Sequence, residues 1–215
     1  MQVVSLMRNT FALCFLAIFA TAAAVSAPPP EPDFCRGLDC PVFTTVTKGN
    51  GFDIREYPEA KWTSITVQEV SSLQTAIGTG FQAIFQYISG DNSASEKIEM
   101  TAPVRVEVLA PQGPYCKANV TTSFFLPWSF QNSSSIPVAN NTAVFTDDIK
   151  ELKVAVLVFP GRPKTDEDIT DQVAKLGALL DTASIKYNKD VFVYAGYDSP
   201  FRVFDRHNEV WLYLL

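Results

Sequence analysis

An order of strand and helix patterns that occurs twice constrains the fold of this chain more than any other feature. In the first half, strand patterns at residues 52–57, 61–67, 100–109 and 123–126 enclose a helical stripe from Leu73 to Ile88. The second half repeats this order, with strand patterns at 143–146, 153–159, 191–197 and 209–215 around a helical stripe from Ile169 to Tyr187. We therefore predict an α+β domain of two pseudo-symmetric repeats, with two long helices packed against a curved, mostly antiparallel sheet or barrel.

Polar residues mark where the two helices begin and end. Ser71 or Ser72 can cap the start of the first helix, and Gly90-Asp91-Asn92 ends it. Thr165 stands where an N-cap belongs for the second helix, and three acidic residues follow it over the positive helix end. The second helix also carries charged residues between its apolar ones, which is typical of a helix with one face in solvent.

The first helix is unusual because no charged residue occurs between Val70 and Gly90. A helix with one face in water normally carries charges there, so an uncharged face indicates contact with something other than water. Gly78 and Gly80 lack side chains and permit close approach, at about 1 kcal/mol each in helix stability. Two interpretations remain open from the residues alone: packing against more protein, or contact with a flat apolar ligand.

Residues 1–24 have the order of a secretory signal peptide. Arg8 precedes an apolar run at residues 11–20, which is too short to span a bilayer, and a series of small residues follows at 22–27. We expect cleavage after Ala23 or Ala24. An N-terminal anchor that is never cut is the alternative.

Three glycosylation sequons agree with export, at Asn119, Asn132 and Asn140. Two of them lie in a Ser/Asn-rich stretch, residues 131–142, that is typical of a surface loop. We therefore expect a secreted glycoprotein, located outside the cell or in the lumen of the secretory pathway or a vacuole, with no membrane span in the mature chain.

Cysteine use leaves the disulfide pairing open. Removal of a signal peptide takes Cys14 and leaves Cys35, Cys40 and Cys116, so that two can pair and the third stays free or pairs between chains. The spacing of Cys35 and Cys40 allows a local loop bond, whereas a bond from Cys116 to either of them would tie the N-terminal arm to the body of the domain. No second Cys pair or His cluster accompanies them, so we expect no metal site.

The composition excludes several classes of partner. Without Arg8 the chain keeps 16 basic and 23 acidic residues, a formal net charge of −7, and its cations are scattered. Nucleic acid and anionic membrane surfaces are therefore poor partners, and the sequence does not identify a protein partner.

The chain is organised as an arm and one domain. A Pro-rich, Cys-containing arm at residues 25–40 precedes a single domain at 41–215.

Known catalytic motifs do not occur in the chain. The nucleophile elbow G-x-S-x-G, the zinc motif H-E-x-x-H, the P-loop and the dinucleotide-binding G-x-G-x-x-G are all absent. A catalytic triad would have to use His207, the one histidine of the chain, and no nucleophile is marked beside it. We therefore do not expect an enzyme.

Several segments resemble motifs of the SOUL/heme-binding protein family. Residues 51–57 are similar to its opening strand, and residues 88–92 followed by 97–104 are similar to the signature after its first helix. Residues 195–200 and 206–211 resemble its C-terminal motif. The resemblance implies a distorted β-barrel of two repeats flanked by two helices, similar to the effector-binding domains of some bacterial regulators.

The resemblance also implies a ligand and a place for it. Family members bind heme or another tetrapyrrole, a small flat hydrophobic molecule, reversibly in a shallow apolar groove between the first helix and the loop before the last strand. On this chain the groove residues would be Gly78, Phe81, Gln82, Phe85, Phe201, Arg202 and Phe204.

The chain departs from the family pattern at the positions of two cations. Porphyrin binders of the family carry basic residues on the first helix, and this chain has Gly78 and Gln86 at those positions. Pairing with the carboxylates of the ring would then rest on Arg202, aided by Arg206 or Lys97.

His207 lies in a run of charged residues, and we interpret it as an exposed turn residue rather than an axial iron ligand. The expected function is therefore extracellular tetrapyrrole binding without obligatory iron ligation. A carrier of another hydrophobic ligand, or a protein-interaction module on the same fold, is the alternative.

Overall fold

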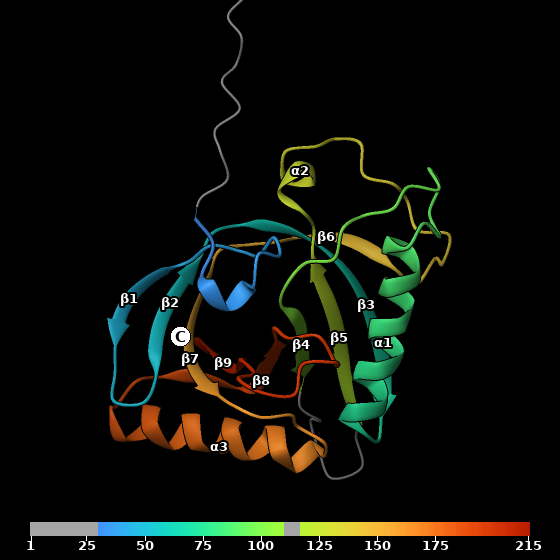
Figure 1. The fold of residues 1–215 in the computed structure, drawn as a ribbon. Helices are drawn as coiled ribbons and strands as arrows, with labels where there is room; N and C mark the ends of the chain where they lie inside the picture. The colour runs from blue at the N-terminus through green and yellow to red at the C-terminus, as the bar shows by residue number, and fades with distance from the viewer. Residues whose placement is uncertain (1–29, 110–116) are drawn as a thin grey trace, which may run out of the picture.

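A computed structural model describes residues 30–109 and 117–215 (Figure 1). The strands are β1 (Thr44–Lys48), β2 (Asp53–Tyr57), β3 (Ala60–Val70), β4 (Val104–Leu109), β5 (Ala118–Phe125), β6 (Phe145–Ile149), β7 (Leu152–Phe159), β8 (Tyr187–Gly196) and β9 (Asn208–Leu214). The helices are the 3-10 turn η1 (Asp33–Cys35), α1 (Leu73–Ile88), α2 (Trp128–Gln131) and α3 (Asp166–Thr182). The expected signal peptide, with Cys14, and Cys116 lie outside the described residues. Within the described ranges, no helix has the length and apolar character needed to cross a membrane.

The nine strands form one sheet in the order β1-β2-β7-β9-β8-β4-β5-β3-β6, and every pairing is antiparallel. The first repeat contributes β3-β5-β4 and the second contributes β7-β9-β8, and these two triplets meet where β4 pairs with β8. The repeats also exchange their first strands, because β2 pairs with β7 and β6 pairs with β3. The predicted α+β class and the two-repeat order are thus confirmed.

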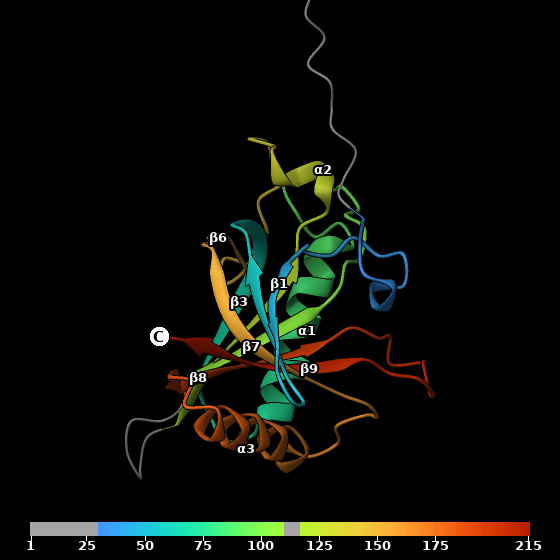
Figure 2. The same ribbon diagram turned by 90° about the vertical axis from the view of Figure 1, so that its left-hand side faces the viewer.

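The edges of the sheet are β1 and β6, and no pairing joins them within the described residues. Closure into a barrel therefore stays a prediction. The sheet is nevertheless strongly curved, since Figure 2 shows β1 running upright while β9 runs across the view.

The two long helices cover one face of the sheet and bury the main core. α1 packs on β3 and β5, and α3 packs on β7, β8 and β9. Because successive side chains of a strand point to opposite faces, alternate residues such as Val106, Leu157 and Val210 meet the helices. Ala76 of α1 and Leu176 of α3 belong to the same buried cluster.

The helix starts follow the polar residues that predict them. Ser72 caps α1 by accepting a hydrogen bond from Thr75 N, and Thr165 caps α3 in a capping box with Asp168. Asp166, in the first turn of α3, also accepts from the backbone N–H groups of Leu73 and Gln74, each at 2.9 Å. The carboxylate therefore stabilises the start of α1 and fixes the two helices to each other.

The second helix is shorter than its apolar periodicity predicts. α3 ends at Thr182, and the chain turns at Ser184, which takes a left-handed conformation with φ of 57°. Tyr187, expected as the last residue of the helical stripe, instead begins β8 and pairs with Leu214 of β9. The strand expected from residue 100 begins at Val104, after Pro103. The short elements β1 and α2 were not predicted.

The described end of the N-terminal arm, residues 30–40, covers part of the opposite face of the sheet together with residues 41–43, and from here on we call residues 30–43 the arm. Cys35 and Cys40 form a disulfide in which both residues are buried, so the local alternative is the one that the structure contains. Around it the arm packs on residues of β2, β7, β8 and β9. The arm is also fixed to the loops, because Asp39 O accepts from Ala102 N and Glu31 accepts from Trp128 Nε1.

Two glycines of α1 predict opposite effects of adding one methyl group. A Cβ at Gly80 would lie 2.4 Å from Thr122 Oγ1, so we expect Gly80→Ala to lower the free energy of unfolding by about 1–3 kcal/mol through overpacking. A Cβ at Gly78 would meet no atom within 4 Å, so Gly78→Ala should raise it by up to about 1 kcal/mol. Urea denaturation measures both. Equal stability of the two variants would show that α1 does not pack on Thr122. Adding Thr122→Ala should recover only part of the loss in Gly80→Ala, because the Cβ of residue 122 would still lie 2.7 Å from the new Cβ.

Candidate functional site

The uncharged face of α1 is exposed to solvent. Gly78, Gln82, Phe85 and Gln86 are all exposed, whereas Gly80 on the opposite side of the helix is buried against β5. Packing within the described chain therefore accounts for the inner face of α1 and not for its lack of charge. What the exposed face contacts, a ligand or more protein, therefore stays a prediction.

Two aromatic rings occupy this exposed face. Phe81 and Phe85, one helical turn apart, stack with ring centroids 5.7 Å apart and an interplanar angle of 12°. Phe81 is half-buried because its ring also contacts Phe124 of β5 at 5.2 Å, while Phe85 is 42% exposed. Together with the open space beside Gly78, they give an apolar patch on this side of α1.

The loop that joins β8 and β9, residues 197–207, presents a second set of apolar side chains. Phe201, Val203 and Phe204 are 91%, 75% and 82% exposed. Figure 2 shows this loop reaching out from the sheet. An apolar loop tip so far from other atoms is unusual in a folded domain and is typical of a surface that another molecule covers.

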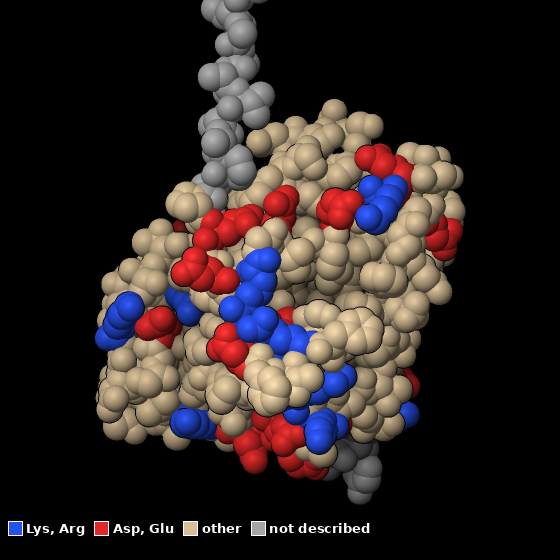
Figure 3. Space-filling model, viewed as in Figure 1, with Lys and Arg blue, Asp and Glu red and all other residues tan. Residues whose placement is uncertain are grey.

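The cations near the loop already have partners in the chain. Arg202 forms ion pairs with Asp198 at 3.3 Å and with Asp205 at 3.0 Å. Arg206 donates to the backbone carbonyls of Asp198, Ser199 and Arg202. Figure 3 shows basic side chains gathered in the middle of this face with acidic ones around them. A carboxylate of a ligand would therefore have to compete with Asp198 and Asp205 for Arg202.

Lys97, the third expected cation, pairs with Glu99 at 3.1 Å on the surface. The structure thus brings Phe81 and Phe85 together on α1, and it places Phe201 and Phe204 on one loop, each exposed. Among the described residues, no hydrogen bond or ion pair joins the two sets. A groove shared by them remains a prediction.

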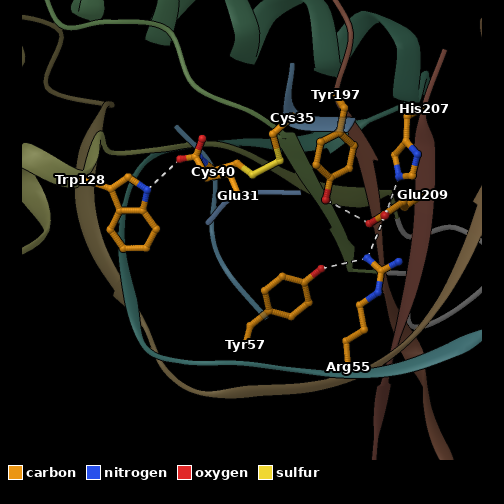
Figure 4. Close-up of a disulfide and its surroundings, with 9 residues drawn as sticks. All are labelled: Glu31, Cys35, Cys40, Arg55, Tyr57, Trp128, Tyr197, His207 and Glu209. Carbon is orange, nitrogen blue, oxygen red and sulfur yellow. Dashed lines mark hydrogen bonds and ion pairs between the residues drawn. A yellow bond between two sulfur atoms is a disulfide. The ribbon is translucent and has the colours of Figure 1, made fainter. Parts of the chain in front are cut away.

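Below this loop lies a buried ionic cluster, which we call the Glu209 cluster (Figure 4). Glu209 is fully buried, and its carboxylate accepts hydrogen bonds from four side chains. The donors and their distances are Arg55 Nη1 at 2.9 Å, His207 Nε2 at 2.7 Å, Trp211 Nε1 at 2.8 Å and Tyr197 Oη at 3.1 Å. Because the charge of Glu209 is matched by Arg55 and by hydrogen bonds, the pair can be held without water.

The aromatic side chains of the arm close this cluster. The guanidinium of Arg55 lies 4.2 Å from the ring centroid of Phe43, and Phe34 stacks on His207 at 4.1 Å with an interplanar angle of 4°. Burial alone would raise the pKa of the Glu209 carboxyl, but the hydrogen bond from His207 and the charge of Arg55 outweigh it and hold that pKa below its ordinary value. Glu209 is therefore ionised in the folded protein at neutral pH.

The interpretation of His207 as an exposed turn residue is wrong. Its side chain is 15% exposed, one face of the ring lies against Phe34, and Nε2 is taken by Glu209. The signal that could have found this position is the alternation of His207, Glu209 and Trp211, which directs their side chains to one face of the last strand. Because Nε2 is hydrogen-bonded to Glu209, this nitrogen of His207 is not available to a heme iron. Among the described residues, no group of three His, Cys, Asp or Glu side chains could hold a metal ion.

Known proteins match this chain over most of its length. The profile of the family "SOUL heme-binding protein" matches residues 38–213. Heme-binding protein 2 of Mus musculus is 35% identical over 161 residues, which cover 75% of this chain and 77% of the relative. Heme-binding protein 2 of Homo sapiens is 34% identical with the same coverage, and heme-binding protein 1 of Xenopus laevis is 28% identical over 76% of this chain and 83% of its own length.

Solved structures show the same fold at low sequence identity. The C-terminal domain of EcmrR has a TM-score of 0.58 and 12% identity, and the alignment covers 76% of this chain and 96% of that domain. EcmrR in complex with DNA gives a TM-score of 0.56 and 10% identity, covering 75% of this chain and 56% of the other. At such identities the likeness concerns the arrangement of strands and helices alone.

Proposed function

The chain belongs to the SOUL heme-binding protein family, and from this premise we propose that it binds heme or another tetrapyrrole reversibly, with the ring against the exposed uncharged face of α1. The observation that carries the proposal is that Phe81, Phe85 and Gly78 form an apolar patch on α1 that the described residues leave at least partly exposed. The relatives that match this chain in sequence are named heme-binding proteins, which supports a binding role.

Apolar contact supplies most of the binding free energy in this proposal. Burial of a few hundred Å² of ring and side-chain surface at about 25 cal/mol per Å² gives several kcal/mol before ordering costs. One exposed ion pair adds at most about 1 kcal/mol. Arg202 contributes less than that, because a ligand carboxylate would replace partners that Arg202 already has in Asp198 and Asp205.

Binding by surface contact does not require a bond to iron. We therefore expect metal-free protoporphyrin to bind within a few-fold of the affinity of hemin, measured by titration and quenching of tryptophan fluorescence. His207→Ala should leave this ratio unchanged, since His207 Nε2 faces Glu209 and not the surface of α1. Loss of binding with the metal-free ring, or loss of hemin binding in His207→Ala with an intact fold, would show that iron is ligated.

The alternative function is a carrier of another flat hydrophobic ligand, or a protein-interaction module, and the exposed Phe201 and Phe204 also suit these roles. Absorbance during titration with hemin separates the alternatives. A tetrapyrrole carrier gives a saturable Soret band with a defined stoichiometry, whereas an interaction module gives the spectrum of free hemin at every ratio.

We also propose that the chain is exported and glycosylated, which rests on the signal-peptide pattern of residues 1–24 and the three sequons. Asn132 at the end of α2 and Asn140 are exposed, while Asn119 in β5 is half-buried. Intact-mass measurement of the native protein should show a chain that begins between Ala23 and Pro28 and, if the host is eukaryotic, carries glycan on at least one of the three asparagines. A mass that includes Met1 and no glycan would contradict this.

A further inference from the structure

The loop between β8 and β9, residues 197–207, carries three large apolar side chains that the core does not use. Among the described residues, Phe201 is the most exposed large apolar side chain, and Val203 and Phe204 follow it in the same loop. None of the three belongs to a buried hydrophobic cluster of the described chain. Figure 2 shows the loop extending beyond the sheet, so these side chains project from the domain.

The backbone of this loop is already hydrogen-bonded within the protein. Four of its carbonyl oxygens accept hydrogen bonds from arginine side chains, namely those of Asp198, Ser199, Arg202 and Asp205. Arg206 donates to the first three, and Arg36 and Arg202 donate to the fourth, at distances between 2.7 and 3.1 Å. The N–H groups of Phe201 and Arg202 donate to Ser199. A loop that enters an apolar layer needs such internal partners, because the layer supplies none.

Arg36 of the arm meets two arginines of the loop beside this apolar tip. It forms ion pairs with Asp198 at 3.5 Å and with Asp205 at 3.1 Å, and Arg202 pairs with the same two carboxylates. Within the described residues, Arg206 donates only to backbone carbonyls. Three arginines against two aspartates leave the cluster with one positive charge. Asp205, the exposed acid of the tip, is neutralised by its two arginine partners.

The order of these groups matches the surface of a phospholipid bilayer. Headgroup phosphates are anionic and hydrocarbon lies directly beneath them, so a surface that inserts there needs cations beside an apolar tip. Long arginine side chains can stay at the level of the phosphates while neighbouring apolar groups go deeper. A small ligand would instead need a concave site that encloses it, which a projecting loop does not provide.

We propose that this loop inserts into the surface of a phospholipid bilayer, with Phe201, Val203 and Phe204 among the acyl chains and the arginines at the phosphates. This contact is separate from tetrapyrrole binding, which uses α1. Because the chain as a whole is acidic, with a formal net charge of −6, the one positive charge of the loop adds little attraction to an anionic membrane. Burial of the apolar tip therefore supplies the binding, and the chain as a whole remains a poor partner for strongly anionic surfaces.

Flotation with extruded vesicles tests this contact in the mature chain, free of hemin. One set of vesicles contains phosphatidylcholine alone, and the other also contains phosphatidylserine. We expect the protein to float with both sets, with partition coefficients that differ by no more than about five-fold, the effect of a single cation near an anionic surface. Phe204→Trp adds a local reporter, whose fluorescence should shift to shorter wavelength when vesicles are added.

Serine variants assign the contact to the loop. Phe201→Ser combined with Phe204→Ser should lower the partition coefficient about ten-fold or more, because two exposed rings no longer enter the bilayer. Neither ring belongs to a buried cluster, so the fold should stay intact. Val138→Ser changes a side chain that is 70% exposed elsewhere on the surface, and as the matched control it should leave the partition coefficient unchanged.

The inference is overturned if the wild type floats with neither set of vesicles, or if the double serine variant floats as the wild type does. Binding that requires phosphatidylserine and disappears at high salt would also overturn it, because charge and not the apolar tip would then hold the protein. A double variant that loses hemin binding and still floats would show that the ring, and not lipid, covers the loop. Since flotation is done without hemin, failure of either proposal leaves the other standing.

Discussion

Replacing Glu209 with glutamine is expected to lower the free energy of unfolding by about 3–5 kcal/mol, the largest loss among single exchanges in this domain, because it leaves a buried cation without its counter-charge. Arg55 is 3% exposed, and Glu209 is its partner at 2.9 Å, with Asp53 further away at 3.6 Å. The neutral amide also fails as the acceptor of four donors. Chemical denaturation at neutral pH measures the loss.

Two further variants make the result specific to the unpaired charge. Glu99→Gln breaks an exposed pair with Lys97 and should leave the denaturation midpoint unchanged. Arg55→Met combined with Glu209→Gln removes the unpaired cation and should recover most of the stability that Glu209→Gln loses. A single Glu209→Gln variant as stable as the wild type would mean that water or another anion reaches Arg55.

The Glu209 cluster also makes the free energy of unfolding depend on pH in the acidic range. The pKa of Glu209 in the folded protein is lower than in the unfolded chain, where it is about 4.3. Its contribution to stability is therefore complete above that pH and is lost as the pH falls towards the lower folded value. Glu209→Gln should flatten this part of the stability profile. A wild-type profile with no decline below about pH 4 would show that the pKa is not lowered.

Much of the fold follows from patterns that act over a few residues. Alternation and the 3.6-residue period place strands and helices, and Ser72 and Thr165 mark helix starts because capping is a contact between near neighbours. The exchange of β2 and β6 between the repeats is a contact between segments far apart in the chain. Tyr187 shows the same limit, since the periodicity continues through it while the backbone turn at Ser184 has already ended the helix.

In the candidate site too, features set by near neighbours in the sequence could be predicted, and features set by distant contacts could not. The pairing of Phe81 and Phe85 is a consequence of helical spacing and could be predicted. The commitment of Arg202 to Asp198 and Asp205 depends on how the loop folds back on itself. The position of His207 depends on Phe34, which is brought to it by the arm from the other end of the domain. The charged residues beside His207 in the sequence therefore gave no sign that its ring is mostly buried.

Phe85→Asp and Phe81→Asp are expected to weaken hemin binding more than ten-fold, while Arg202→Ala should weaken it only a few-fold. Each aspartate removes a ring from the proposed contact surface and places a carboxylate beside a ligand that carries carboxylates itself. Arg202→Ala removes at most one exposed ion pair, worth up to about 1 kcal/mol. Phe85 is the cleaner position because it is 42% exposed, whereas Phe81 also packs on Phe124 and its loss costs stability.

Gly78→Arg tests the same surface with a change that should strengthen hemin binding rather than weaken it. No atom lies within 4 Å of a Cβ built at Gly78, so the arginine fits without displacing the helix and returns a cation to a position where family members that bind porphyrin carry one. It should tighten hemin binding by a few-fold, since one exposed ion pair is worth up to about 1 kcal/mol, while Gly78→Gln, of similar length but uncharged, should not. If Phe85→Asp and Gly78→Arg both bind hemin as the wild type does, with circular dichroism showing an intact fold, then the ring does not lie on α1. The exposed, uncharged face of this helix would then serve a protein partner instead.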